Sequence, residues 1–333
     1  RDRSVSRGLG DVYKRQGMFM EGIEQNPVVY DLQFELLTAA KPIDLDKWLD
    51  KYILRRYGKY SDTLRKVWDL LLETCYRSDG YKENGVGSAI ASRPQMVPKK
   101  AGPCCKNKLY YDTAKFEKAV ILFLSVSDEY KSSDAYQYDL CDLMRQAMSN
   151  RFYDTQPQFA AACKKKDAAA AEKIARDQLS LLADLDTLLS HRKEFCFSRW
   201  INDCHALASD DEEKRYFDLN ARTLLTSWGD IRANTSALYD YAWREWSGLI
   251  KEYYYRRWKM FYEYVLNCLN NKRMPLLITG DGYVGRFWYK TYPFGKKLNQ
   301  FELSWLKEYR EYAAPMNSDV IGPAKKYAKK WGL

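Results

Sequence analysis

One carboxylate near the beginning of the chain stands where an enzyme could use it. Glu21 follows the short apolar run 18–20 and precedes Gly22, and the amides Gln25 and Asn26 come next, just before an apolar-periodic helix. A carboxylate at the end of a strand, followed by a glycine turn, is how barrel enzymes present a catalytic acid at the carboxyl-terminal face of the barrel. The same pattern fits a solvated turn glutamate, so this stretch alone leaves both interpretations open.

Other chemistries find few candidates in the chain. The sequence holds eight cysteines without a Cys-x-x-Cys pair and two histidines, His191 and His205. Cys204 and His205 are adjacent, but neighbours on a helix point about 100° apart, which is poor for joint metal ligation. A zinc site and a histidine-based catalytic triad are therefore both unexpected.

The net charge of +10 raises the question of nucleic-acid binding. Acidic and basic residues are mixed along the predicted helices, as in residues 210–215, so we expect a solvated mixed-charge surface and no nucleic-acid partner. No apolar run approaches the ~20 residues of a membrane span.

Residues 280–285, Gly-Asp-Gly-Tyr-Val-Gly, match a dinucleotide fingerprint, but Pro293 follows soon after them and no parallel sheet is predicted. We therefore expect no dinucleotide site there.

Residues 1–16 have no helical or strand period and join the next segment abruptly. They resemble the translated sequencing-adapter read-through found at the ends of environmental gene fragments, so we exclude them from the fold. On this interpretation the source is an uncultured bacterium, and the natural protein extends upstream of residue 17.

Helical periodicity dominates from about residue 41 onward, and strand-like segments are almost absent, which predicts an all-α architecture. Asp44 is a good N-cap and Gly58 a good C′ residue for the first helix of this part. Residues 78–103 are rich in Gly, Ser and Pro and predict a long surface loop. The further helices that we expect span residues 61–75, a stretch from about 113, a stretch from about 134, and 158–190, 197–207, 210–228, 240–270, 301–312 and 323–331, with 271–295 irregular.

Several short motifs occur in an order that is typical of one enzyme family. They are Glu21-Gly-Ile-Glu-Gln-Asn-Pro-Val-Val-Tyr30, Ala91-Ser-Arg-Pro94, Tyr138-Asp-Leu-Cys-Asp-Leu-Met-Arg-Gln146, Arg222-Thr-Leu-Leu-Thr-Ser-Trp-Gly229, Asp240-Tyr-Ala242, Trp246-Ser-Gly-Leu249 and Tyr254-Tyr-Arg-Arg-Trp258. Together they resemble the α-N-acetylglucosaminidase family, glycoside hydrolase family 89, from about Gly17 to Trp331. One such motif is weak support, whereas this many in the correct order are strong support.

The resemblance implies a small α/β domain, a (β/α) barrel and a C-terminal all-α domain. Residues 17–40 are then expected to be the last part of the barrel and residues 41–333 the α-helical domain, so that the chain is mainly α. The resemblance also implies an exo-acting enzyme that removes terminal α-linked N-acetylglucosamine with retention and needs no metal or organic cofactor. Its partner is a glycan with that terminal sugar. The family further suggests an exported enzyme, periplasmic or at the cell surface in a bacterium.

Retaining glycosidases use two carboxyl groups about 5–5.5 Å apart. By resemblance Glu21 is the nucleophile, and Gln25 and Asn26 are near enough in sequence to hold it or a sugar hydroxyl. Asn26 is equally well placed to cap the helix that begins at Pro27. Tyr30, one turn into this helix, either lines the pocket or packs in the core.

Two aromatic residues of the helical domain are further candidates. Trp228, at a helix end, either packs in the core or forms part of the sugar subsite, with Tyr241 nearby. Arg222 is expected to form an ion pair that orients the loop. Glu24 is the rival carboxylate; it lacks a trusted family match and is expected to be solvated.

The general acid does not lie in the matched segments, and by resemblance it belongs to an earlier strand of the barrel. We therefore expect the 333-residue chain to be inactive alone. Without the family resemblance, the alternative is a helical module that binds glycan or protein through its aromatic surfaces and catalyses nothing.

Overall fold

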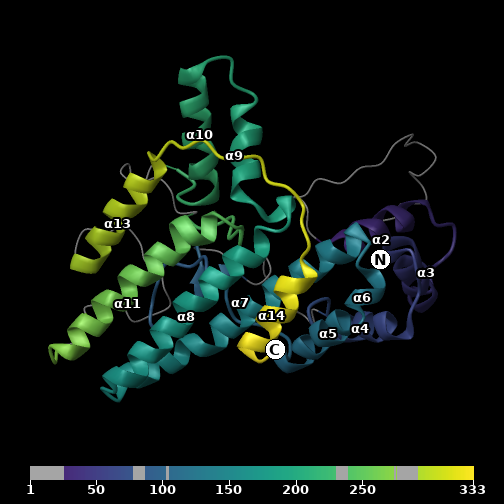
Figure 1. Cartoon of the computed structure of the whole chain (residues 1–333), viewed down its shortest axis with the longest axis horizontal. Helices are drawn as coiled ribbons and strands as arrows, with labels where there is room; N and C mark the ends of the chain where they lie inside the picture. The colour runs from purple at the N-terminus through teal and green to yellow at the C-terminus, as the bar shows by residue number, and fades with distance from the viewer. Residues whose placement is uncertain (1–25, 78–86, 103–104, 230–238, 274, 276–291) are drawn as a thin grey trace. The chain divides into compact units, whose positions relative to one another are not determined.

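A computed structural model describes residues 26–77, 87–102, 105–229, 239–273, 275 and 292–333 of the chain (Figure 1). Glu21, Glu24, Gln25 and the glycine motif at 280–285 lie outside these described residues. The chain divides into two compact units, Arg1–Arg65 and Lys66–Leu333. The domain boundary expected between residues 40 and 41 stays a prediction.

The prediction of a mainly α fold is confirmed. The described helices are α2 (Pro27–Thr38), α3 (Leu45–Tyr57), α4 (Asp62–Glu73), α5 (Thr113–Ser125), α6 (Ser127–Tyr130), α7 (Asp134–Lys164), α8 (Ala168–Leu189), the 3-10 turn Lys193–Phe195, α9 (Phe197–His205), α10 (Asp211–Leu225), the π-helix η3 (Ile250–Tyr254), α11 (Tyr255–Asn270), α13 (Pro293–Leu306) and α14 (Ile321–Trp331). Among the described residues the strands are the two-residue pair β1 (Lys100–Ala101) and β2 (Cys105–Lys106), which run antiparallel. None of the described helices is long and apolar enough to cross a membrane.

In the first unit, α2 and α3 are joined by a polar contact between their side chains. The indole Nε1 of Trp48 donates to Glu35 Oε2 at 2.6 Å. Helix α3 begins and ends as the sequence predicts, because Asp44 accepts the backbone N–H of Lys47 and Gly58 takes the left-handed conformation at φ 80°. The two ends of this helix are therefore set by residues beside them in the sequence.

The core of the second unit is built on α7 and α8, which lie side by side, with α11 along α8 (Figure 1). Their facing side chains are large and apolar. Trp258 of α11 is fully buried and meets Phe152 of α7 edge to face at 5.0 Å. Tyr253 and Tyr254 of η3 are buried as well, so they belong to the helix–helix core.

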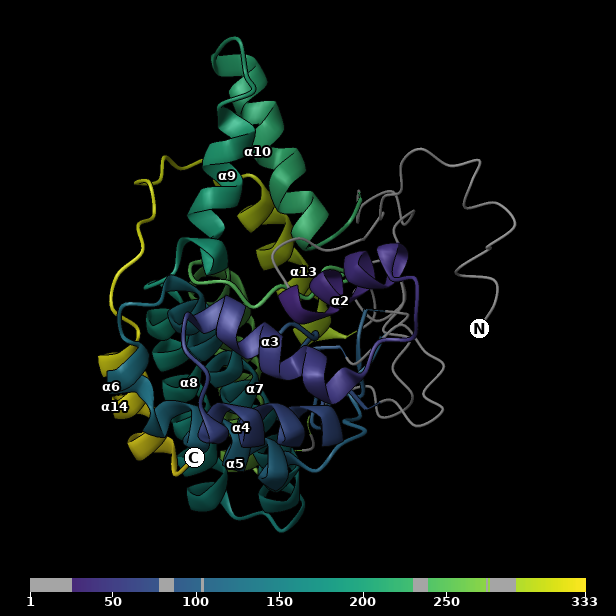
Figure 2. The same ribbon diagram turned by 90° about the vertical axis from the view of Figure 1, so that its right-hand side faces the viewer.

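Helices α9 and α10 form a hairpin (Figure 2), and buried polar side chains join the two helices. Arg222 is fully buried, and its Nε donates to Asp218 Oδ2 at 2.6 Å. The other oxygen of Asp218 forms a hydrogen bond of 3.1 Å with Nε2 of His205 on α9. The ion pair expected for Arg222 is thus present. It lies within α10 and ties α10 to α9, and Arg222 also donates to the hydroxyl of Tyr312 at 3.2 Å.

Four local predictions are wrong in position. The single helix expected over 158–190 is instead the end of α7 and, after a break at residues 165–167, α8. The described part of the predicted surface loop, residues 87–102, is largely buried, because polar residues in it find partners inside the unit, as Ser92 does with Asn107 at 2.8 Å. The helix expected over 240–270 begins only at Ile250, after an irregular stretch. The helix expected over 301–312 is α13, Pro293–Leu306, which Pro293 starts at its N1 position.

The irregular stretch that precedes η3 is anchored by Asp186 of α8. One oxygen of Asp186 accepts the backbone N–H groups of Gly248 at 2.7 Å and Lys251 at 3.0 Å. The other oxygen lies 3.4 Å from the hydroxyl of Ser247. Burial raises the pKa of Asp186 above its ordinary value of 3.8, and these hydrogen bonds counteract the effect only in part.

A carboxyl group with a raised pKa in the folded state makes the protein less stable as the pH rises through that pKa, since the unfolded chain ionises more easily. We expect Asp186→Asn to keep the acceptor for Gly248 and Lys251 while it removes the buried charge. The free energy of unfolding of the variant, relative to the wild type, should therefore increase from about pH 3 to about pH 7. Urea unfolding at a series of pH values measures this. Asp177→Asn, on a more exposed face of α8, is the matched control, and a pH-independent difference for Asp186→Asn would contradict the assignment.

Candidate functional site

Two of the predicted site residues lie in the described part of the first unit. Asn26 occupies the N-cap position of α2, before Pro27, which confirms the position that one of the two alternatives predicts. Its backbone is at φ 46° and ψ 55°, and its side chain makes no capping hydrogen bond. Tyr30 lies in the first turn of α2 and is half-buried, which agrees with neither full core packing nor full exposure. Glu21 and Gln25 lie outside the described residues, and their roles stay predictions.

In the second unit the structure brings together the two aromatic residues that the sequence singles out. Trp228 and Tyr241 meet edge to face, with ring centroids 5.2 Å apart and an interplanar angle of 73°. Trp228 is 37% exposed, which excludes the core-packing alternative for this residue. A third ring, Trp243, meets Tyr241 at 5.7 Å and 75°. We call these three residues the aromatic row.

The aromatic row depends on a direct contact between two segments that are separated in sequence. The backbone N–H of Asp240 donates to the carbonyl of Thr226 at 2.6 Å, and Thr226 follows the end of α10. This bond places the residues after Thr226 and the residues after Asp240 beside each other. Trp228 and Tyr241 are therefore neighbours because their backbones are.

Asp240 is itself held by a fully buried arginine. Arg257 of α11 binds it with both terminal nitrogens, at 2.8 and 2.9 Å. Burial opposes the charged form of Arg257, but Asp240, Tyr253 and Glu302 outweigh it and the pKa of Arg257 lies well above its ordinary value. The pair is a bidentate, charge-assisted contact, which fixes the relative orientation of the two side chains as well as their distance.

Glu302 and Arg93 are buried as well and extend the network around Arg257. Glu302 of α13 lies 3.5 Å from Arg257 Nε and 3.3 Å from Arg93. The guanidinium of Arg93 lies 3.6 Å from the centre of the Tyr239 ring. We call the four charged residues Arg93, Asp240, Arg257 and Glu302 the buried charge network.

Gly102 shows how closely the loop 87–102 approaches this segment. It has φ +61°, and a Cβ atom on it would lie 2.5 Å from the carbonyl oxygen of Tyr239. A larger residue would therefore push the two segments apart. The buried loop and the buried charge network together support the residues that carry Tyr241 and Trp243.

Glu245 anchors the other end of the same segment. Its two oxygens accept from Ser88 at 2.5 Å, from Ser149 at 2.6 Å and from Arg145 of α7 at 2.6 Å. Arg145 also pairs with Asp142 at 2.8 Å. The segment from residue 239 to 248 forms no helix or strand of its own, so it is held in place by these side-chain contacts, by Asp186, and by backbone hydrogen bonds at Asp240 and Ser247.

The backbone around the aromatic row is in an unusual conformation. Trp228, Asp240 and Trp243 have φ of 58°, 55° and 31°, and they are three of the six non-glycine residues with positive φ in the described part of the chain. Such conformations cost roughly 1–3 kcal/mol each and persist where the surroundings over-determine them, most often at functional sites. Asn26, within the motif that contains the predicted nucleophile, is a fourth.

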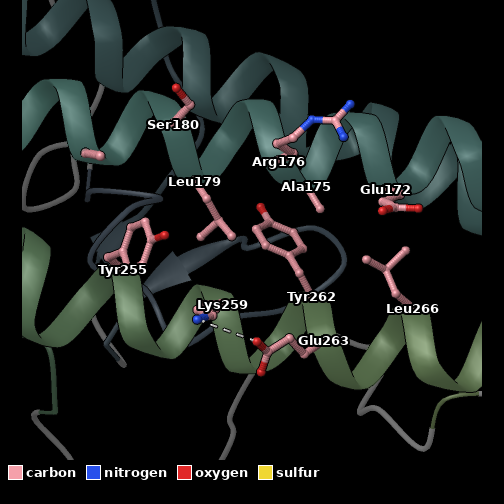
Figure 3. Close-up of a pocket in the computed structure, with 11 residues that line it drawn as sticks. Glu172, Ala175, Arg176, Leu179, Ser180, Tyr255, Lys259, Tyr262, Glu263 and Leu266 are labelled. Carbon is pink, nitrogen blue, oxygen red and sulfur yellow. Dashed lines mark ion pairs between the residues drawn. The ribbon is translucent and has the colours of Figure 1, made fainter.

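A groove of about 400 Å³ between α8 and α11 is a separate feature (Figure 3). Leu179, Tyr255 and Leu266 line it, together with Tyr262, whose hydroxyl donates to Gln156 at 2.7 Å. The carboxylates and ammonium group at its rim, Glu172, Glu263 and Lys259, are exposed. None of the predicted site residues contributes to it. Its lining is what two helices packed side by side leave between them, so we do not count it as part of the site.

Trp243 is a member of the site that the sequence pattern does not predict. A signal is present, since Tyr241 and Trp243 are separated by one residue directly after Asp240, but the pattern predicts a helix over this stretch. On a helix, residues two apart point to different faces. Only the irregular backbone of the folded chain lets both rings join one row.

Comparison with known proteins agrees with this architecture. Residues 48–330 match the family described as the α-N-acetylglucosaminidase (NAGLU) C-terminal domain. The chain belongs to this family. The α-N-acetylglucosaminidase of Homo sapiens is similar to it, with 27% identity over 318 residues, which are 95% of this chain and 39% of the human protein.

Solved structures of family 89 have the same fold. A family 89 glycoside hydrolase from Clostridium perfringens in complex with PUGNAc superimposes with a TM-score of 0.80 and 28% identity over 92% of this chain and 34% of that one. A variant of the Clostridium perfringens enzyme with two glutamates replaced by glutamine, in complex with its substrate GlcNAc-α-1,4-galactose, gives a TM-score of 0.79 and 29% identity, covering 92% and 33%. The chain thus spans about a third of the length of the relatives that it matches, and it is a relative of the family 89 α-N-acetylglucosaminidases.

The buried charge network predicts a large difference between two adjacent arginines. Arg257→Met leaves Asp240 buried without its partner and should destabilise the chain by about 3–5 kcal/mol. Arg256→Met removes a part-exposed arginine, 3.5 Å from Glu308, and should cost less than about 1 kcal/mol. Urea unfolding followed by circular dichroism measures both. Equal costs for the two variants would show that the Asp240–Arg257 pair does not hold the fold.

Proposed function

We propose that this chain is part of a retaining exo-α-N-acetylglucosaminidase, which releases terminal α-linked N-acetylglucosamine from a glycan. The observation that carries the proposal is the partly exposed aromatic row at the positions of two motifs of the family, in a domain that matches this family from residue 48 to 330. Sugar-binding sites combine aromatic faces with a few fixed polar groups. The substrate complex of the Clostridium perfringens relative supports the same class of ligand.

In this proposal Glu21 is the nucleophile that attacks the anomeric carbon. A second carboxyl group, supplied from outside the matched segments, protonates the leaving oxygen and later activates the water that releases the sugar. Gln25 and Asn26 hold Glu21 or a sugar hydroxyl, and Tyr30 lines the pocket. The replacement of two glutamates in the substrate complex of the relative is consistent with a two-carboxylate mechanism.

Trp228 and Tyr241 contact the N-acetylglucosamine ring in this proposal. Aromatic faces bind the apolar C–H side of a pyranose and leave its hydroxyl groups to polar partners. The buried charge network keeps both rings at a fixed position before substrate arrives. Preorganisation of this kind raises affinity because less freedom is lost on binding.

Residues 17–40 are proposed to be the last part of a (β/α) barrel. Helix α2 supports this proposal, because its apolar residues Val29, Phe34 and Leu36 are exposed. Exposed apolar residues concentrated on one short helix are typical of a surface that packs against further protein. The remaining barrel strands and the general acid would then come from upstream.

The first functional prediction concerns the isolated chain. The 333-residue polypeptide should release no p-nitrophenol from p-nitrophenyl α-N-acetylglucosaminide above the uncatalysed background, since it holds one half of the carboxyl pair. The complete gene product should be active in the same assay. Turnover by the isolated chain would contradict the assignment of the general acid to the upstream part.

The second functional prediction concerns the nucleophile. In the complete gene product, Glu21→Gln should lower kcat/KM by at least about a thousandfold, because an amide cannot form the glycosyl–enzyme ester. Glu24→Gln, three residues away, is the matched control and should retain most activity. Loss of activity in Glu24→Gln with retention in Glu21→Gln would reverse the assignment.

A further inference from the structure

Both histidines of the chain lie beside one irregular segment of the second unit. Residues 307–320 connect α13 to α14 without forming a helix or a strand, and we call them the strap. Figure 1 shows the strap in yellow, where it leaves α13, passes α9 and runs to α14. The ring of His205, at the end of α9, stacks on Tyr309 with centroids 5.5 Å apart. The Nδ1 atom of His191 forms a hydrogen bond of 2.8 Å with the hydroxyl of Ser318. Since the sequence holds two histidines, every imidazole of the protein contacts the strap.

The His191 end of the strap keeps its contacts in both protonation states of the ring. A hydroxyl group both donates and accepts, so Ser318 can donate to a neutral Nδ1 and accept from a protonated one. The backbone N–H of Ser318 also donates to the carbonyl of His191 at 2.9 Å. In the middle of the strap, the carbonyl of Tyr312 accepts from the side chain of Asn202 on α9 at 3.1 Å. Neither contact depends on the charge of an imidazole.

His205 has a carboxylate on each side. Its Nε2 atom lies 3.1 Å from Asp218 of α10, and its Nδ1 atom lies 4.0 Å from Glu311 of the strap. Carboxylates only accept, and a neutral imidazole has a single N–H. The shorter distance assigns this N–H to Asp218, so the neutral ring turns the lone pair of Nδ1 toward Glu311. Protonation replaces this lone pair by a second N–H, which adds an attraction between α9 and the strap.

The other ionisable groups around His205 come from α9, α10 and the strap. They are Asp203, Cys204, Lys214, Arg215, Asp218, Arg222, Tyr309 and Glu311. The Tyr309 hydroxyl and the Lys214 ammonium donate to Glu311 and hold the pKa of that carboxyl below its ordinary value of 4.5. The bond to Glu311 raises the pKa of Tyr309 above 10.0, and burial raises the pKa of the Cys204 thiol above 9.0. Imidazoles ordinarily change charge between about pH 5 and 8. A pH-dependent contribution of Glu311 within that range therefore reports on His205.

We propose that His205 is a pH-dependent latch for the strap. In mildly acidic solution the imidazolium binds Asp218 and Glu311 together, and it ties the part of the strap before Tyr312 to the α9–α10 hairpin. In alkaline solution the bond to Asp218 persists, whereas the attraction to Glu311 is lost. The latch is independent of the proposed function, because all of its residues lie in the second unit.

The test measures how much Glu311 stabilises the 333-residue chain at about pH 5.5 and about pH 8. We expect Glu311→Gln to raise the unfolding equilibrium constant by a factor that is about threefold larger at the lower pH, in the range of a part-exposed ion pair. The sign follows from linkage, since an interaction that needs the protonated ring is present at low pH and is lost as the pH rises. In a His205→Gln background this pH dependence should vanish. Urea unfolding followed by circular dichroism measures all four chains.

Glu308→Gln is the matched control in the same strap. Glu308 lies 2.9 Å from Arg310 and 3.5 Å from Arg256, and arginine stays protonated throughout this range, so its effect should be equal at both pH values. Ser318→Ala, at the His191 end, should likewise cost the same at both. An equal effect of Glu311→Gln at the two pH values, or a pH dependence that persists in His205→Gln, would overturn the proposal. If His205→Gln does not fold, the comparison of Glu311→Gln with Glu308→Gln decides alone.

Discussion

The pairing of Asp240 with Arg257 is the constraint on which the rest of the candidate site depends. Two opposite charges at full burial are tolerated only when each satisfies the other, because removing an ion from water costs far more than one contact usually returns. Here both terminal nitrogens of the Arg257 guanidinium donate to the carboxylate of Asp240. The pair therefore fixes the orientation of Asp240, and with it the course of the backbone that follows Asp240.

That direction matters because residues 239–248 form neither helix nor strand. A regular element would be held along its length by its own backbone hydrogen bonds. Within the described part of the chain, this segment has backbone hydrogen bonds to distant residues only at Asp240 and Ser247, and side chains from α7, α8 and α11 hold it as well. Asp186, Arg145 and Arg257 are the main ones, and Glu302 lies 3.5 Å from Arg257. An irregular loop on a rigid scaffold is a common way to present binding residues, since the scaffold supplies precision and the loop supplies shape.

The apolar core and the polar site have different tasks in the second unit. Helices α7, α8 and α11 bury rings such as Phe152 and Trp258, which gives stability without specifying any chemistry. The groove between α8 and α11 is part of that packing. The aromatic row lies where the helices end, and there the positive φ angles collect. The candidate site and the strained backbone therefore coincide, as is usual when a site needs conformations that its residues do not prefer.

The family, the mainly α class and the helices whose ends are set by nearby residues can all be inferred from the chain of amino acids alone. Asp44 and Gly58 show why: a cap acts within four residues, so its effect is readable in the sequence. The motif residues Trp228 and Tyr241 can also be found in the sequence, because they belong to motifs that resemble those of the family. That these two rings touch, that Trp243 joins them and that residues 87–102 are buried became visible only in the folded molecule. Those outcomes rest on contacts across many residues, such as Arg257 with Asp240 and Ser88 with Glu245, and no local pattern encodes a partner so far away in the chain.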